Sequence, residues 1–335
     1  MSKAVVENEA AAAARGSGGK AGLVAIALLA VLGACLPMLT QDQPFLLMLA
    51  SHAVVAAIVA LSLDMLTGNT GLLSFGHAAW YGFGAYLAGW LSKSVTADIL
   101  VVVLMTVAAA ALVSAIVGVI LVRQIGKTFA ILTLALSQIM FATVFVFSDV
   151  TGGEDGLQGI PIPSFLGFRI VDPGVWYWIL YGTLVCALAG AIHIRRSPLG
   201  KAWLAIRENT ERSRYIGTNV AMLKLFAYVI SAALAAVAGA LFALFNGAAS
   251  PDLLNWFESG KVLMYVVLGG VGTLVGPVFG AIVFTFAEHY VSSHTDSWLI
   301  YFGGLFVVIV IVAPGGLFGA AAKLWKRMSR AEAVR

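Results

Sequence analysis

The stretch 99-ILVVVLMTVAAAALVSAIVGVILV-122 decides the fold of this chain. It contains no charged residue, and its apolar side chains do not alternate with polar ones. An α-helix rises about 1.5 Å per residue, so a run of this length spans the roughly 30 Å hydrocarbon core of a bilayer. Strands of a membrane barrel would instead be alternating segments of about ten residues. The stretch therefore predicts a transmembrane α-helix.

The composition of the whole chain supports the same class. Apolar residues make up 61% and charged residues 11% of its 335 residues, against roughly 45–50% and about 25% in soluble domains. A soluble fold cannot hide that much apolar surface, whereas a bilayer serves as an apolar solvent for it. The two cysteines, Cys35 and Cys186, lie inside apolar runs without a metal-binding or disulfide spacing. We predict an all-α, polytopic integral membrane protein.

Ten apolar runs are candidate spans. A signal peptide ending near Cys35 is the alternative for the first run, but the long polar leader and the spans that follow at once favour a retained helix. The eighth and ninth runs are short, and a glycine-rich break, 269-GGVGTLVGP-277, separates them. The expected spans are 21–39, 45–66, 72–91, 98–122, 128–148, 175–193, 222–246, 261–275, 276–291 and 298–313.

Basic residues predict the orientation of the spans, because Lys and Arg concentrate in short cytoplasmic loops. They gather in both terminal tails and in the 123–127 and 194–221 loops, whereas the 149–174 and 247–260 loops are mainly acidic. Lys93 is the one discordant charge. Two crossings around the glycine-rich break return the C-terminus to the side of the N-terminus, and a re-entrant pair there would do the same.

We therefore expect both termini in the cytoplasm and three regions along the chain. An N-terminal tail covers 1–20, a transmembrane domain with the cytoplasmic loop 194–221 covers 21–318, and a basic tail covers 319–335. The sequence holds no Walker A, HExxH or GxSxG motif. We expect no catalytic residue, no metal and no cofactor, so any ATP hydrolysis that drives this protein belongs to another chain.

A few polar residues lie inside the expected spans. Asp64 and Glu288 are close to span ends, and we interpret both as solvated helix ends. His77 lies a helical turn or more inside the third span, with Ser74 and Thr70 before it. These three either line a polar translocation path or, in the case of His77, bond to a neighbouring helix. The nearby glycines 76, 82, 84 and 89 favour close helix packing.

Two glycine-rich breaks resemble each other and lie on the same predicted side. One is 68-GNTGLL-73 and the other is 269-GGVGTL-274. Transporters often interrupt their helices at such places, because unwound backbone supplies polar groups to a path. The expected helix-break residues are Gly68, Gly71, Gly269, Gly270, Gly272, Gly276 and Pro277.

The loop 194–221 contains a candidate amphipathic helix from Ala202 to Tyr215, which Gly217 would end. Its expected apolar face holds Ala202, Trp203, Ala205 and Ile206, against charged residues on the other face. Such a helix either lies on lipid headgroups or docks to a cytoplasmic partner. Periodicity alone slightly favours the headgroup interpretation.

The chain resembles the permeases of branched-chain amino acid ABC importers, of the LivM type in the LivH/LivM family. The resemblance covers most of the chain from residue 45 onward. It rests on 63-LDMLTGNTGLLSFGHAAWYGFGAYLAG-89, 151-TGGEDGLQGIP-161, 197-SPLGKAWLAIRENTERSRYIGTNV-220, 262-VLMYVVLGGVGTLVGPVFGA-281 and 313-APGGLFG-319.

The resemblance implies the ABC importer permease fold with about ten transmembrane helices, in a transport subunit of a bacterial inner membrane that works by alternating access. It implies a second, LivH-like permease subunit, two cytoplasmic ATPase subunits and a periplasmic substrate-binding protein as partners, besides membrane lipid and without nucleic acid. It also shifts the loop helix towards docking. The residues it assigns to ATPase coupling are Gly200, Ala205, Ile206, Arg207, Glu208, Asn209, Arg212 and Gly217.

Leucine, isoleucine and valine are the substrates that the resemblance favours. Urea and amide importers have similar permeases and are the alternative. A secondary transporter or channel that needs no ATP is the alternative from another class, and it predicts transport by this chain alone. A membrane enzyme is disfavoured, because the sequence offers no catalytic cluster.

Overall fold

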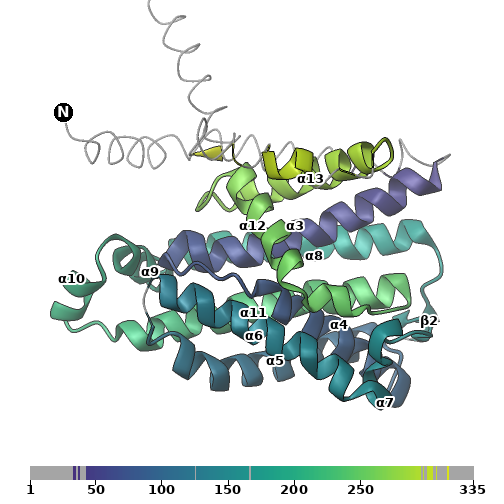
Figure 1. Ribbon diagram of the computed structural model, residues 1–335, viewed down its shortest axis with the longest axis horizontal. Helices are drawn as coiled ribbons and strands as arrows, with labels where there is room; N and C mark the ends of the chain where they lie inside the picture. Colours follow the sequence, from purple (N-terminus) through teal and green to yellow (C-terminus); the bar gives the residue numbers. More distant parts are fainter. Residues whose placement is uncertain are drawn as a thin grey trace, which may run out of the picture.

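The computed structural model describes residues 43–295 except 125 and 166, together with residues 33, 34, 37, 297, 300–304, 307, 315 and 316. It is almost entirely helical (Figure 1). Its elements are α3 (Pro44–Thr70), α4 (His77–Ser94), α5 (Ile99–Leu121), α6 (Lys127–Val146), α7 (Ser148–Thr151), the 3₁₀ helix η1 (Gly153–Asp155), β1 (Ser164–Phe165), β2 (Phe168–Arg169), α8 (Pro173–Arg196), α9 (Pro198–Glu208), α10 (Thr210–Tyr215), α11 (Val220–Asn246), the 3₁₀ helix η2 (Pro251–Leu254), α12 (Trp256–Gly269) and α13 (Val275–Ser292).

Five of these helices, α3, α5, α6, α8 and α11, are long and apolar enough to cross a membrane. This confirms a multi-pass helical protein. Most residues of the expected spans 21–39 and 298–313 lie outside the described residues, so the count of ten spans stays a prediction. Helix α12 has 14 residues, which corresponds to about 21 Å and falls short of a full crossing.

The helix ends follow from local sequence. Asp98 accepts hydrogen bonds from the amides of Leu100 and Val101 at the start of α5, and Asp172 caps α8, which Pro173 opens. Such caps satisfy amides that have no partner inside the helix, and proline is compatible with the first turn. The bounds expected for the long spans therefore agree with the structure to within a few residues.

Helices α3 and α11 form the centre of the bundle, and the other long helices lie around them. Close packing depends on small residues, as predicted. A Cβ atom on Gly84 of α4 would overlap the backbone of Ala236 in α11, and one on Gly239 of α11 would overlap the backbone of Tyr81. At the periphery, α5 exposes Leu104, Leu112, Ile116 and Ile120, which is the apolar stripe of a lipid-facing helix.

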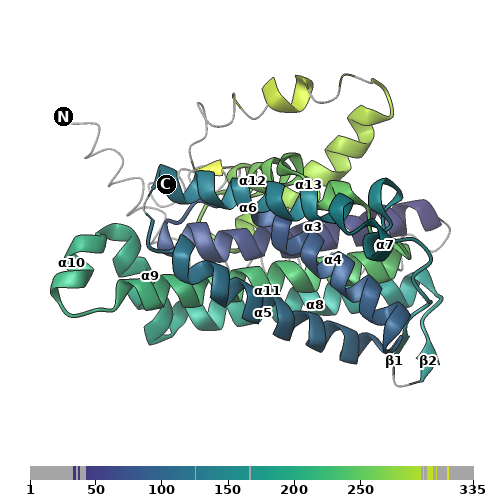
Figure 2. The same ribbon diagram turned by 60° about the horizontal axis from the view of Figure 1, so that its bottom comes forward.

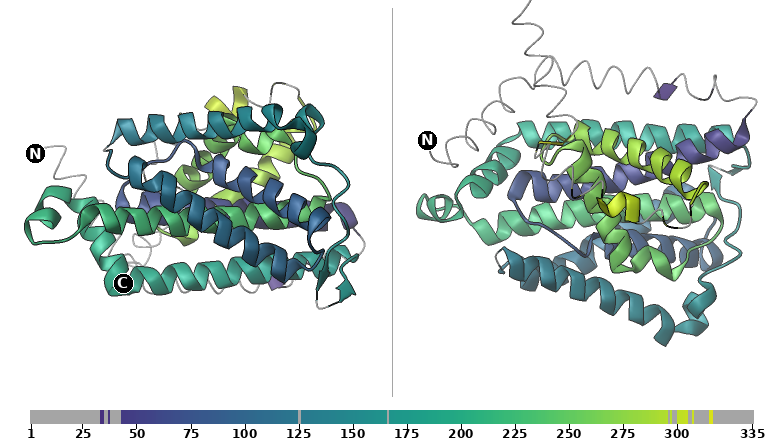
Figure 3. Two further views of the ribbon diagram at one scale, coloured as in Figure 1. Left: turned by 90° about the horizontal axis from the view of Figure 1, so that it is seen from below. Right: turned by 45° about the horizontal axis from the view of Figure 1, so that its top comes forward.

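The bundle has two distinct ends (Figures 1 and 2). We call one the α9 end, where α9, α10 and the last turn of α3 lie. The other, the hairpin end, carries the antiparallel pair β1–β2. In both views of Figure 3, the α9–α10 segment projects beyond the long helices.

The segment before α12 enters the bundle instead of forming an outer loop. Ser137 in the middle of α6 donates a 2.7 Å hydrogen bond to the carbonyl of Leu254, and Leu254 packs where Gly82 of α4 leaves space. Ser259 accepts a 3.0 Å bond from the amide of Ala78 at the start of α4. The prediction of a loop over 247–260 is therefore wrong for its second half, which forms η2 and the start of α12, because its apolar residues and small polar groups have partners inside the bundle.

Candidate functional site

The two glycine-rich breaks meet at the α9 end. Helix α3 ends at Thr70, and Gly71 adopts a left-handed backbone with φ of 77°. Helix α12 ends at Gly269, and Gly270 and Gly272 also have positive φ values. A Cβ atom on Gly68 would lie 2.6 Å from Cα of Gly272. Helices end at both glycine-rich stretches, but Gly68, expected within the first break, lies inside α3, and the first break covers residues 71–76. Glycine is required at Gly68 and Gly272, where the backbones touch.

Gly276 and Pro277, which were expected within the second break, lie in the first turn of α13. This position suits proline, because the amides of a first helical turn lack intrahelical acceptors. A Cβ atom on Gly276 would overlap the backbone of Gly269. The break itself is therefore confined to residues 270–274.

Asp64 holds the second break. Its Oδ1 accepts a 2.5 Å hydrogen bond from the amide of Gly272, and its Oδ2 accepts a 2.9 Å bond from the amide of Leu274. The side chain is fully buried, so the prediction of a solvated helix end is wrong. Leu274 has a φ of 63°, which is rare for a residue with a Cβ atom. The carboxylate fixes this turn by bonding to its amides.

Two arginines, one on α8 and one on α9, bond to the backbone at the two breaks. Nη1 of Arg207 in α9 donates to the carbonyl of Gly68 in the last turn of α3, before the first break. Nη1 of Arg195, at the end of α8, donates a 2.5 Å bond to the carbonyl of Gly272 in the second break. We call Asp64, Arg195 and Arg207, with the backbone groups they bind, the clamp. It joins both breaks to α9.

Helix α9 is fixed to the bundle on its buried side. Trp203 is fully buried, and its Nε1 donates a 2.8 Å bond to the carbonyl of Leu223 at the start of α11. Ile206 is buried beside it. A Cβ atom on Gly200 would overlap the backbone at the end of α8. Because α9 is packed this tightly, a displacement of α9 moves Arg207 with it.

The single helix expected from Ala202 to Tyr215 is two helices. Asn209 has an extended backbone between them, and its Oδ1 accepts a 2.8 Å bond from the amide of Arg212. Asn209 is therefore the N-cap of α10, a role that asparagine fills well. Gly217 follows α10 with a positive φ, as expected for the residue after a helix.

The outer surface of α9 and α10 faces away from the bundle. Ala205, expected on the apolar face, is exposed, as are Glu208 and Arg212. Tyr215 and Ile216 are 87% and 75% exposed. We call these five residues the α9–α10 surface. Its two large apolar side chains were not singled out from sequence, because they lie at the end of a charged helix.

The three expected path residues are all buried. His77 is the first residue of α4 and not a turn inside it, because residues 71–76 are not helical. Its Nε2 lies 2.7 Å from Oγ of Ser62 in α3, and Thr70 bonds within its own helix. The structure confirms the contact of His77 with a neighbouring helix. A role of Thr70, Ser74 and His77 in a path stays a prediction.

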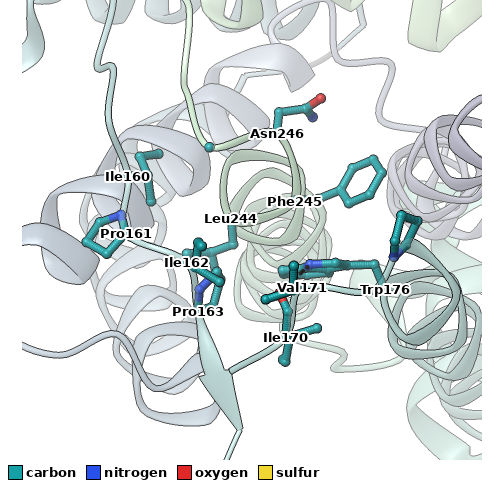
Figure 4. Close-up of a pocket in the computed structure, with 12 residues that line it drawn as sticks. Ile160, Pro161, Ile162, Pro163, Ile170, Val171, Trp176, Leu244, Phe245 and Asn246 are labelled. Atoms are coloured by element: carbon teal, nitrogen blue, oxygen red, sulfur yellow. Dashed lines mark hydrogen bonds between the residues drawn. The ribbon is translucent and has the colours of Figure 1, made fainter. Parts of the chain in front are cut away.

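The hairpin end carries an apolar hollow of about 260 Å³ (Figure 4). Its walls come from the loop after η1, the base of the hairpin, and the facing ends of α8 and α11. Trp176 Nε1 donates a 3.2 Å bond to the carbonyl of Ile170, and the amide of Ile160 donates a 3.1 Å bond to the carbonyl of Gly247. The stretch 151-TGGEDGLQGIP-161 is thus joined by backbone bonds of Leu157 and Ile160 to the segment after α11. Among the described residues, no group of His, Cys, Asp and Glu could hold a metal ion.

Comparison with known proteins gives a consistent result. The profile of the family described as branched-chain amino acid transport system / permease component matches residues 45–314. The chain is 29% identical to the LivM permease protein of Escherichia coli (strain K12), over 80% of this chain and 69% of that protein. It is 26% identical to the LivH permease protein of the same strain, over 78% of this chain and 91% of that protein. No solved structure matches.

Proposed function

Because the chain belongs to the branched-chain amino acid transport permeases, we propose that it is the permease subunit of an ATP-driven importer of leucine, isoleucine and valine. The substrates rest on what the similar permeases are named for, LivM and LivH among them. A further relative, the autoinducer 2 import permease LsrC of Klebsiella pneumoniae, matches 52% of the chain at 28% identity. A urea or amide importer is the alternative.

The proposed protein lies in a bacterial inner membrane with both termini in the cytoplasm, so that the α9 end faces the cytoplasm. Its partners are a LivH-like permease subunit, two ATPase subunits and a periplasmic substrate-binding protein. The basic loop around α9 supports this orientation through the concentration of Arg and Lys on cytoplasmic sides. The exposed Tyr215 and Ile216 support a protein partner at this end, because large apolar side chains are stabilised when a partner covers them.

The clamp is the observation that carries the mechanism. ATP-driven closure of the ATPase subunits displaces the α9–α10 surface, and α9 moves as a rigid body on Trp203 and Ile206. Arg207 then pulls on Gly68, while Asp64 and Arg195 link this movement to the second break. Each charge-assisted bond contributes about 1.5–3 kcal/mol, which ATP binding can exceed. Alternating access follows when both breaks open together.

The resemblance assigned two neighbouring residues, Arg207 and Glu208, to the same contact, and this mechanism gives them different roles. Both are exposed, but the guanidinium of Arg207 bonds to the carbonyl of Gly68 in the bundle, while Glu208 belongs to the α9–α10 surface. Arg207 therefore transmits movement into the permease, and Glu208 with Arg212 contacts the ATPase. Gly200, Ala205, Ile206, Asn209 and Gly217 shape the segment that carries both.

The test is transport by the four-subunit complex in vesicles with the binding protein present. Arg207→Met leaves the ATPase subunits bound but lowers leucine imported per ATP hydrolysed by about tenfold, the effect of losing one charge-assisted bond. Glu208→Lys instead weakens ATPase binding. Arg169→Met, at the exposed hairpin end, is the control and keeps the wild-type ratio. Coupled transport at the wild-type ratio in Arg207→Met, or leucine transport by this chain without ATP, contradicts the proposal.

A further inference from the structure

Three charged side chains form a cluster between α12 and α13. Nζ of Lys261 lies 3.1 Å from Oε1 of Glu258, one turn earlier in α12, and 3.1 Å from Oε1 of Glu288 in α13. We call these three residues the triad. Their side chains are only 16–24% exposed, so the triad is mostly covered but not fully buried.

The triad lies inside the bundle and not on a solvated loop. Its neighbour Ser259 bonds to the first turn of α4, and the buried Tyr265 lies one turn further along α12, against Phe284 of α13. Glu288 was interpreted from sequence as a solvated helix end, which is wrong because it is paired and mostly covered. Ionisable groups inside a membrane protein are costly and line substrate pathways when they persist.

The charges of the triad do not balance. Two carboxylates share one ammonium group, and Lys261 is the one cation that the structure pairs with either of them among the described residues. The exposed pair Glu211–Arg214 is by contrast one to one. The cluster thus has spare capacity for a second cation.

We propose that the triad binds the head group of an α-amino acid zwitterion during its passage through the permease. The α-ammonium group of the ligand is the second cation beside Glu288 and Glu258, and its carboxylate bonds to Lys261, so that binding adds no net charge to the triad. Tyr265 and Phe284, which are buried and pack on each other one turn further along, make the surroundings of the triad apolar. The inference rests on the proposed function, because it assigns a contact site to the substrate of that importer.

Glu288→Gln is the most informative variant, because it leaves the matched pair Glu258–Lys261 and removes only the excess carboxylate. In vesicles with all partners and leucine-loaded binding protein, it lowers leucine imported per ATP hydrolysed by roughly tenfold. Glu288→Asp keeps the charge, and its leucine import per ATP hydrolysed lies within about twofold of the wild-type value. Lys93→Met, which removes an exposed cation, keeps the wild-type ratio.

A second variant guards against loss of folding. The double variant Lys261→Glu with Glu288→Lys keeps the net charge and an ion pair. It exchanges the position of the ammonium group with that of one carboxylate, so that the two ends of the ligand no longer face their partners. The amount of leucine imported per ATP hydrolysed falls as in Glu288→Gln, while the melting temperature in detergent stays near that of the wild type. A wild-type ratio in either Glu288→Gln or the exchanged variant overturns the site and leaves the importer standing. If wild-type vesicles import no leucine, isoleucine or valine, the proposed function and the ligand of the triad both fail.

Discussion

The clamp and the triad are both built from charged side chains that join separate helices, but the clamp bonds to backbone groups and the triad bonds to other side chains. In the clamp, Asp64 and Arg207 bond to backbone groups of glycine-rich segments. In the triad, Lys261 bonds to two carboxylates. Charges that bond to backbone fix the path of the chain, whereas charges that bond to one another can exchange a partner for a ligand. The difference suggests a conformational role for the first and a binding role for the second.

Removing the carboxylate of Asp64 gives the largest expected loss of stability. Asp64→Ala leaves the amides of Gly272 and Leu274 without acceptors in a buried place, and it also removes two charge-assisted bonds of about 1.5–3 kcal/mol each. We expect roughly 3–6 kcal/mol of destabilisation and poor accumulation in the membrane. Melting in detergent and the amount of inserted chain measure this. Near-normal stability would show that the carboxylate does not hold the break.

The comparison predicts a smaller loss of stability for the triad. Glu288→Gln leaves a one-to-one ion pair, so we expect a loss within about 1 kcal/mol in the same melting experiment. Transport per ATP falls nonetheless, as argued above. If Glu288→Gln were instead as destabilising as Asp64→Ala, the triad would be a structural cluster like the clamp.

Close contact between the two breaks can be tested without touching a charge. In Gly68→Ala, the new Cβ atom lies 2.6 Å from Cα of Gly272 and 2.6 Å from Oδ1 of Asp64. The breaks must separate, at a cost of roughly 1–3 kcal/mol, and transport falls with the loss of the clamp geometry. Gly190→Ala in α8 is the matched control, because its Cβ atom meets nothing within 4 Å. It should be neutral or stabilising, since alanine favours helix.

Sequence patterns predicted the helices and the glycine-rich breaks, but they did not predict the side chains that join the two breaks. Gly269–Gly272 was recognisable as an interruption because glycine, and proline after it, are local signals. The partner of Asp64 is 208 residues away in the chain, and no periodicity reveals such a contact. The re-entry of η2 was missed because Asp252 and Glu258 made the segment look like a loop. Asn209 was taken as part of a helix, although asparagine is a common N-cap.

The smallest expected effect on stability concerns the α9–α10 surface. Ile216 is 75% exposed, so Ile216→Ser should change the stability of the chain by less than about 0.5 kcal/mol. In the assembled importer we expect it to weaken binding of the ATPase subunits by roughly tenfold, because an apolar contact of about 1–2 kcal/mol is lost. Affinity of the ATPase for the permease pair in detergent measures this.

Phe168→Ser is the matched control for Ile216→Ser, since Phe168 is 80% exposed at the opposite, hairpin end. It should leave ATPase binding unchanged, because the proposed orientation places it on the other side of the membrane. If Phe168→Ser weakened the ATPase and Ile216→Ser did not, the orientation would be reversed, and the clamp would then lie at the periplasmic side. The clamp geometry itself would survive that result, since its bonds do not depend on which side of the membrane it faces.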